Sequence, residues 1–334
     1  MSLTSYLTAP SRDIVTTPFE AGASYDGFAG HARFILLNFG VSSPVPISIT
    51  VLSSKEQDER AANHRALIET ITLPMRDRKS RQQRHPVYDF IHTYYSFSLG
   101  RLEKWHSGFG IILEDDSKTD FSPKYYRREN HTAFIDPSLL TSKGRERLTR
   151  IKTLLELTQS RPPNLTCHGL HEWAMVYQGG EIRHRESAPL RLPQDEIDSL
   201  VASRPICCTH FDAFRFFTPG AIPLNRLAPT LHSRQDFEQP GCIHANMDLY
   251  KWAYKSSPWI SSDLLREALF FAIKAREIDM RASPYDLTSY GYEAITIETA
   301  EGRRQYEQVQ RELYLKGLPL RERLIEALSK VVSA

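Results

Sequence analysis

Three short segments in the middle of the chain each place cysteine and histidine next to a carboxylate. They are Cys167–Glu172, Cys207–Asp212 and Cys242–Asp248. Imidazole and carboxylate are ligands that suit zinc and non-haem iron, and two histidines with one carboxylate are the pattern of iron oxygenases. Thiolate ligands would shift the choice toward structural zinc. The three segments therefore predict a metal centre if they meet in space.

The first segment is expected to open a helix over 168–177. In that helix His168, His171 and Glu172 have the spacing i, i+3 and i+4, so they share one face. A single helix face would then present two imidazoles and one carboxylate. No fixed motif such as His-Glu-x-x-His supports the assignment, so it depends on the other two segments.

The other two segments repeat the pairing of imidazole and acid in different local structures. The segment 206–217 is expected to be extended, where His210 and Asp212 point the same way because side chains alternate. In a helix expected over 243–255, His244 and Asp248 stack one turn apart. Any one of these histidines could instead cap a helix or satisfy a buried polar group. For the three pairs together, a shared site is the favoured interpretation.

The residues around these segments supply candidates for catalysis and substrate binding. Arg215 interrupts a run of phenylalanines, and such a guanidinium either pairs with a nearby acid or faces a ligand anion. The segment Arg276–Asp286 carries dense charge at the end of a long apolar helix, as a buried ion network or an acid/base site would. The predicted metal ligands are His168, His171, Glu172, His210 and His244, the predicted catalytic acids are Asp212, Asp248 and Asp279, and the predicted substrate-binding residues are Arg215, Arg281, Trp173 and Tyr285.

The charge balance argues against nucleic-acid binding by the chain as a whole. Lys plus Arg is 42 and Asp plus Glu is 40, so the formal charge is only +2. The most basic run, Arg76–Arg84, is more often a solvated connector than a phosphate site. We therefore expect a small-molecule substrate.

Other classes of protein lack their sequence signals. No apolar run is long enough to cross a membrane, and the first residues do not resemble a secretory signal, so a cytoplasmic protein is expected. Four cysteines without a Cys-x-x-Cys pair fit a reducing compartment. No Gly-rich phosphate loop and no Gly-x-Ser-x-Gly elbow occurs, so nucleoside triphosphate and α/β-hydrolase chemistry have no support.

The elements that must position these residues are mostly helices. Residues 1–52 predict an extended arm, and 53–334 predict a single mainly helical α+β domain. In that domain small antiparallel strand elements pack with a helical C-terminal part. Strands are expected at 110–113, 125–128 and 132–135, and helices at 53–73, 86–95, 145–159, 168–177, 194–203, 243–255, 262–281, 300–315 and 319–331. The segment 219–241 is expected to be a long loop, and loops of that length are usually functional or disordered.

Long motifs between about residues 85 and 320 resemble a bacterial family common in actinobacteria and labelled 3-methyladenine DNA glycosylase. They include His168–Tyr177, His210–Pro219, Asp248–Ala253 and Asp279–Leu287. The resemblance implies hydrolysis of an N-glycosidic bond. Helix-hairpin-helix glycosylases carry a Gly-rich hairpin before a catalytic Asp, and this chain has no such hairpin.

The leading hypothesis is therefore an enzyme that depends on a divalent transition metal, Fe or Zn. It would act on a small planar or anionic substrate through the histidine and carboxylate site. One alternative is a metal-free N-glycosidic hydrolase that uses Asp212, Asp248 or Asp279 to activate water. The other is a non-catalytic binding module.

Overall fold

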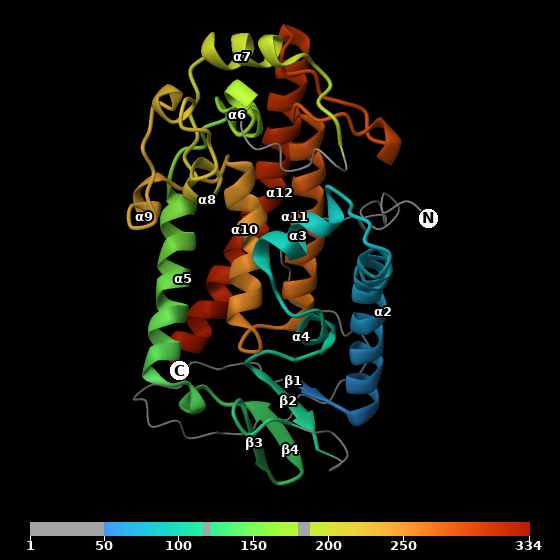
Figure 1. Cartoon of the computed structure of the whole chain (residues 1–334). Helices are drawn as coiled ribbons and strands as arrows, with labels where there is room; N and C mark the ends of the chain where they lie inside the picture. The colour runs from blue at the N-terminus through green and yellow to red at the C-terminus, as the bar shows by residue number, and fades with distance from the viewer. Residues whose placement is uncertain (1–49, 116–120, 180–187) are drawn as a thin grey trace, which may run out of the picture.

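The computed structural model describes residues 50–115, 121–179 and 188–334 of the chain. These residues form a mainly helical α+β fold, which confirms the predicted fold class. In Figure 1 the helices α10, α11 and α12 run through the middle, with the sheet at the lower end and α6, α7 and α8 at the upper end. Apart from β1, the predicted N-terminal arm lies outside the described residues.

The helices carry most of the chain. In order they are α2 (Ser54–Ser80), α3 (Tyr88–Tyr95), α4 (Leu99–Glu103), α5 (Ser142–Ser160), α6 (Leu170–Ala174), α7 (Gln194–Ala202), α8 (Phe211–Phe214), α9 (Arg234–Phe237), α10 (Ile243–Ser256), α11 (Ser262–Arg281) and α12 (Ala300–Ser333). Short 3-10 turns cover Pro137–Leu139, Tyr177–Gly179, Ile222–Leu224 and Thr288–Tyr290. None of the helices in the described ranges is long and apolar enough to cross a membrane.

Four short strands form one mixed sheet. They are β1 (Thr50–Leu52), β2 (Ile111–Glu114), β3 (Tyr126–Glu129) and β4 (Thr132–Ile135), in the order β1-β2-β4-β3. The three predicted strands are present and pair antiparallel, but β4 lies between β2 and β3, so they do not form the meander that their order in the chain suggested. β1 adds a parallel strand, with Val51 opposite Ile112.

Two helices run through a proline at which a helix was expected to end, in α2, or to begin, in α12. α2 contains Pro74 and α12 contains Pro319. A proline inside a helix removes one backbone hydrogen bond at a cost of about 3 kcal/mol. Contacts with distant residues follow each proline: Arg78 pairs with Asp89 after Pro74. The buried Arg321 donates to Asn246 Oδ1 at 3.0 Å after Pro319.

Two predictions about the central segments were wrong. Of the helix expected over 168–177, only α6 (Leu170–Ala174) forms. It begins late because His168 and Gly169 both have left-handed backbone angles, with φ values of 45° and 75°. The segment 206–217 is not extended throughout, because α8 begins directly after His210.

The helix α10 forms the buried axis of the fold. It packs against α11, α12 and α5, and every one of its residues except Lys255 is buried. Its observed bounds agree with the predicted helix at 243–255 to within one residue. Since α10 carries charged side chains, its burial requires that each of them meets a partner inside the protein.

Candidate metal centre

Within residues 50–115, 121–179 and 188–334, two buried groups of side chains could hold a metal ion. We call them the His171 cluster, made of His171, Glu172, His244 and Asp279, and the His210 cluster, made of His210, Glu238 and Asp248. The ligand atoms of each cluster lie within 4.8 Å of one another. A histidine from each of the three segments thus lies in the interior of the fold, in one of two clusters.

The His171 cluster joins three helices. His171 and Glu172 come from α6, His244 from the first turn of α10, and Asp279 from the last turns of α11. His171 Nε2 lies 2.7 Å from Asp279 Oδ1, and His244 Nε2 lies 3.9 Å from Asp279 Oδ2. Arg276, fully buried on α11, donates from one nitrogen to Glu172 and to Asp279, at 2.6 Å each. Two carboxylates therefore pair directly with one guanidinium, which leaves one negative charge for a histidine or an ion to balance.

The pKa values of the two histidines of this cluster shift in opposite directions. Burial lowers the pKa of His244 to about 3, so its ring is the neutral form that binds metals. Burial also opposes the charged form of His171, but the adjacent Asp279 carboxylate raises the pKa of His171 well above its usual value. Burial likewise opposes the charged form of Asp279, and His171 lowers the pKa of that carboxyl. Without an ion, the two residues form a buried charged pair.

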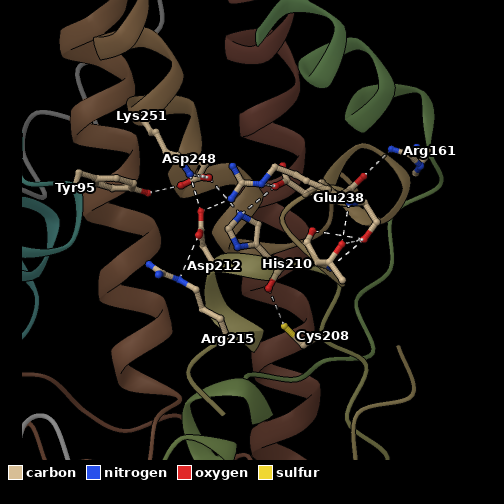
Figure 2. Close-up of polar contacts among 12 residues, drawn as sticks. Tyr95, Arg161, Cys208, His210, Asp212, Arg215, Glu238, Asp248 and Lys251 are labelled. Carbon is tan, nitrogen blue, oxygen red and sulfur yellow. Dashed lines mark hydrogen bonds and ion pairs between the residues drawn. The ribbon is translucent and has the colours of Figure 1, made fainter. Parts of the chain in front are cut away.

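The His210 cluster lies beside the His171 cluster. The rings of His210 and His244 stack with centroids 5.5 Å apart, while His244 meets His171 edge-on at 4.6 Å. Figure 2 shows His210 between Asp248 and Glu238. Its Nε2 lies 3.3 Å from Asp248 Oδ2 and 3.5 Å from Glu238 Oε1.

Neither ring nitrogen of His210 makes a hydrogen bond within the described part of the chain, although the residue is 1% exposed. The two contacts of Nε2 are longer than a good charge-assisted hydrogen bond, which is about 2.7–2.9 Å. Two ligand atoms that each lie about 2.1 Å from one ion are separated by about 3–3.5 Å, from the metal–ligand distances alone. The distances around His210 Nε2 therefore fit shared coordination better than hydrogen bonding.

Cations and a phenol hold the carboxylates of the His210 cluster in place. Lys251 bridges Asp248 Oδ2 at 2.7 Å and Asp212 Oδ2 at 2.8 Å. Tyr95 donates to the other oxygen of Asp248 at 2.8 Å. Arg234 pairs with Asp212, and its Nε lies 2.9 Å from Glu238 Oε1. The carboxylates are thus oriented before any ligand binds.

A small cavity of about 10 Å³ adjoins the His171 cluster. That volume holds about one water molecule. His171, His244 and all four cysteines of the chain are among its lining residues: Cys167, Cys207, Cys208 and Cys242. Cys167 Sγ lies 3.3 Å from His171 Nδ1, so the thiol contacts the ring nitrogen that faces away from Asp279. All four cysteines are free.

Several predicted site residues lie outside both clusters. His168 belongs to neither, because its left-handed backbone takes it out of α6, and the charges acting on it come from Glu307, Arg303 and Arg204. Asp212 joins the site only indirectly, through Lys251 and Arg234.

The predicted substrate-binding residues serve other contacts. Trp173 is fully buried and donates to the backbone oxygen of Ala282 at 2.8 Å. Arg281 donates to the backbone oxygen of Glu293, and Tyr285 is a buried core residue. Arg215 is exposed and lies 3.4 Å from Asp212. None of the four belongs to either cluster or lines the cavity.

The sequence did not indicate the roles of two residues of the site. Glu238 follows α9 in the loop between Pro219 and Gly241, where no periodic pattern marks a buried residue. The length of that loop was the one available signal, since long loops are often functional. Arg276 was recognised as part of a charged segment, but its full burial between Glu172 and Asp279 depends on tertiary packing.

Three arginines of the basic run at the end of α2 form ion pairs with acidic residues of the protein. Arg78 makes a two-pronged contact with Asp89, and Arg76 pairs with Glu103. Arg81 pairs with Asp77 one turn earlier. The first half of the run is the end of α2 rather than a connector, and its arginines pair with acids of the protein.

Comparisons with protein-family models, with curated proteins and with solved structures found no match to this chain.

Proposed function

We propose that the protein is a metal-dependent enzyme whose catalytic ion, Fe or Zn, is held by His171, His244 and Asp279. One observation carries the proposal: two imidazoles and two carboxylates from three separate helices gather within 4.8 Å in the buried interior. Two histidines and one carboxylate are a ligand set that leaves positions open for substrate. Glu172, held by Arg276, is a fourth carboxylate beside them.

The chemistry of such an ion suits the cavity next to it. A bound transition metal lowers the pKa of a coordinated water or binds dioxygen. The cavity adjoins both His171 and His244 and is large enough for about one water molecule. We propose a small planar or anionic molecule as the substrate.

Metal analysis of protein purified without a His tag tests the proposal. We expect about one equivalent or more of Fe or Zn per chain, and its loss in a His244→Asn variant, because a tightly held structural or catalytic ion survives purification. His168→Asn is the matched control, since His168 belongs to neither cluster. Less than about a tenth of an equivalent in the unaltered protein would refute the metal function, given the affinities of such sites.

A second candidate function rests on Cys167. Its Sγ contacts His171 Nδ1 at 3.3 Å while Asp279 contacts Nε2 at 2.7 Å. A thiol, an imidazole and a carboxylate in that order are the arrangement of nucleophilic cysteine enzymes, which need no metal. Alkylation with iodoacetamide at neutral pH separates the two candidates. Rapid modification of Cys167, with slow modification of Cys207 in the same cavity, would support thiol chemistry. Slow modification of both would argue against it.

The N-glycosidic hydrolase implied by the family resemblance is the less favoured proposal. It needs a carboxylate free to activate water, whereas Asp248 pairs with Lys251 at 2.7 Å and Asp279 with Arg276 at 2.6 Å. We therefore predict no tight duplex binding at physiological salt. Submicromolar, salt-sensitive binding together with release of an alkylated base would reverse this ranking.

A further inference from the structure

We infer that the His210 cluster binds a second divalent metal ion, so that the site is dinuclear. The inference rests on the proposed ion at the His171 cluster but uses different ligands: His210, Glu238 and Asp248. The first argument is the imidazole of His210, which is buried: neither nitrogen makes a hydrogen bond of good geometry, and Nε2 has only its longer contacts with Asp248 and Glu238. A buried polar atom without a partner costs free energy and is rare in folded proteins. An ion at Nε2 would give that nitrogen a partner, and Nδ1 would still have none.

The second argument is the spacing of the ligand atoms. His210 Nε2 is 3.3 Å from Asp248 Oδ2 and 3.5 Å from Glu238 Oε1. These separations fit atoms that share one ion at about 2.1 Å. A carboxylate oxygen has two lone pairs, so Asp248 Oδ2 can accept from Lys251 and still bind an ion.

The third argument is charge. The buried carboxylates Glu238 and Asp248 share their cations, Arg234 and Lys251, with Asp212. The further partner of Asp212, Arg215, is exposed. Carboxylates that share their cations in this way are also ligands for a divalent ion.

The fourth argument is position. The helix α10 contributes His244 to one cluster and Asp248, one turn later, to the other. The rings of His210 and His244 stack with their centroids 5.5 Å apart, so a ligand of each ion lies beside a ligand of the other. Enzymes with two metal ions about 3.5–4 Å apart use them to clamp the attacking and leaving oxygens of a displacement. The paired clusters provide the protein side of such a clamp.

Titration of the chelator-treated, tag-free protein with Mn(II) tests the inference, with bound metal measured by equilibrium dialysis and spin coupling by EPR. We expect two equivalents with a spin-coupled spectrum in the unaltered protein. His210→Asn and the nearly isosteric Glu238→Gln should each bind one equivalent with an uncoupled spectrum. Glu238→Gln covers the case in which His210→Asn does not fold. His168→Asn should bind two.

Each other outcome has a distinct meaning. One equivalent in the unaltered protein that persists in both His210 cluster variants would refute the second ion and leave the proposed function standing. One equivalent that disappears in those variants but persists in His244→Asn would overturn the proposed function and the dinuclear site together. Two equivalents without spin coupling would place the second ion elsewhere and overturn the inference. No binding at all would overturn both proposals.

Discussion

His244 and Asp248 lie one turn apart on the same face of α10, yet each belongs to a different buried cluster. His244 faces Asp279 of α11, whereas Asp248 faces His210 and Lys251. One helix thus sets the relative position of both clusters. A change in the packing of α10 must move the two together.

The buried guanidinium of Arg276 should be essential to the folded state. Arg276→Met leaves Glu172 and Asp279 without their shared cation, and breaking a buried ion pair costs about 3–5 kcal/mol. Urea unfolding of metal-free protein measures the loss. The control is Arg304→Met, because Arg304 pairs with Glu301 on the surface, where such contacts contribute about 0–1 kcal/mol. Equal effects of the two substitutions would contradict the described network.

Trp173 should act as part of the scaffold rather than as a platform for substrate. Trp173→Phe removes the hydrogen bond to the backbone oxygen of Ala282 and leaves that buried acceptor unpaired, at a cost of about 1–3 kcal/mol. Metal content should not change, since Trp173 belongs to neither cluster. Thermal unfolding and metal analysis of the same preparation check both expectations. Unchanged stability with altered metal content would mean that Trp173 is part of the metal site.

The stability of the protein should fall in acid partly because of His92. Burial lowers the pKa of His92 to about 4, below the ordinary value of 6.5, so between these values the unfolded chain binds a proton that the folded chain excludes. The contribution of His92 is therefore complete above pH 6.5 and is lost progressively as the pH falls toward 4.

His92→Gln removes this titration. The slope of unfolding free energy against pH should become shallower by up to about 1.4 kcal/mol per pH unit within that window, the value for one proton. Urea unfolding at a series of pH values measures both slopes. Identical slopes for the two proteins would mean that His92 titrates normally in the folded state.

Local patterns in the sequence predicted the helices and strands better than they predicted the residues of the two clusters. The period of apolar residues located α10 to within one residue, and the spacing of His244 and Asp248 followed from helix geometry alone. The same rules failed at Pro74, where α2 continues, and before Pro319, where α12 runs without the expected break. Contacts with distant residues, Arg78 with Asp89 and Arg321 with Asn246, follow the two prolines. Periodicity reports local structure, whereas those contacts exist only after folding.

The composition of the two clusters could be predicted only in part. His171, His210 and His244 were candidates because each stands near an acid, and all three lie in the clusters. His168 has the same neighbours in sequence, but a left-handed turn separates it from them. Glu238 comes from a loop without periodicity, so nothing local marks it as buried. Whether His168 and Glu238 belong to a cluster depends on contacts between distant segments.

The most direct test of the central claim is anomalous diffraction from crystals of tag-free protein, recorded at the absorption edges of Fe and Zn. The account predicts a strong peak enclosed by His171 Nε2, His244 Nε2 and the Asp279 carboxylate, the three groups that meet beside the cavity. The absence of any peak there, with His171 still bonded to Asp279 in crystals grown with excess metal, would contradict it.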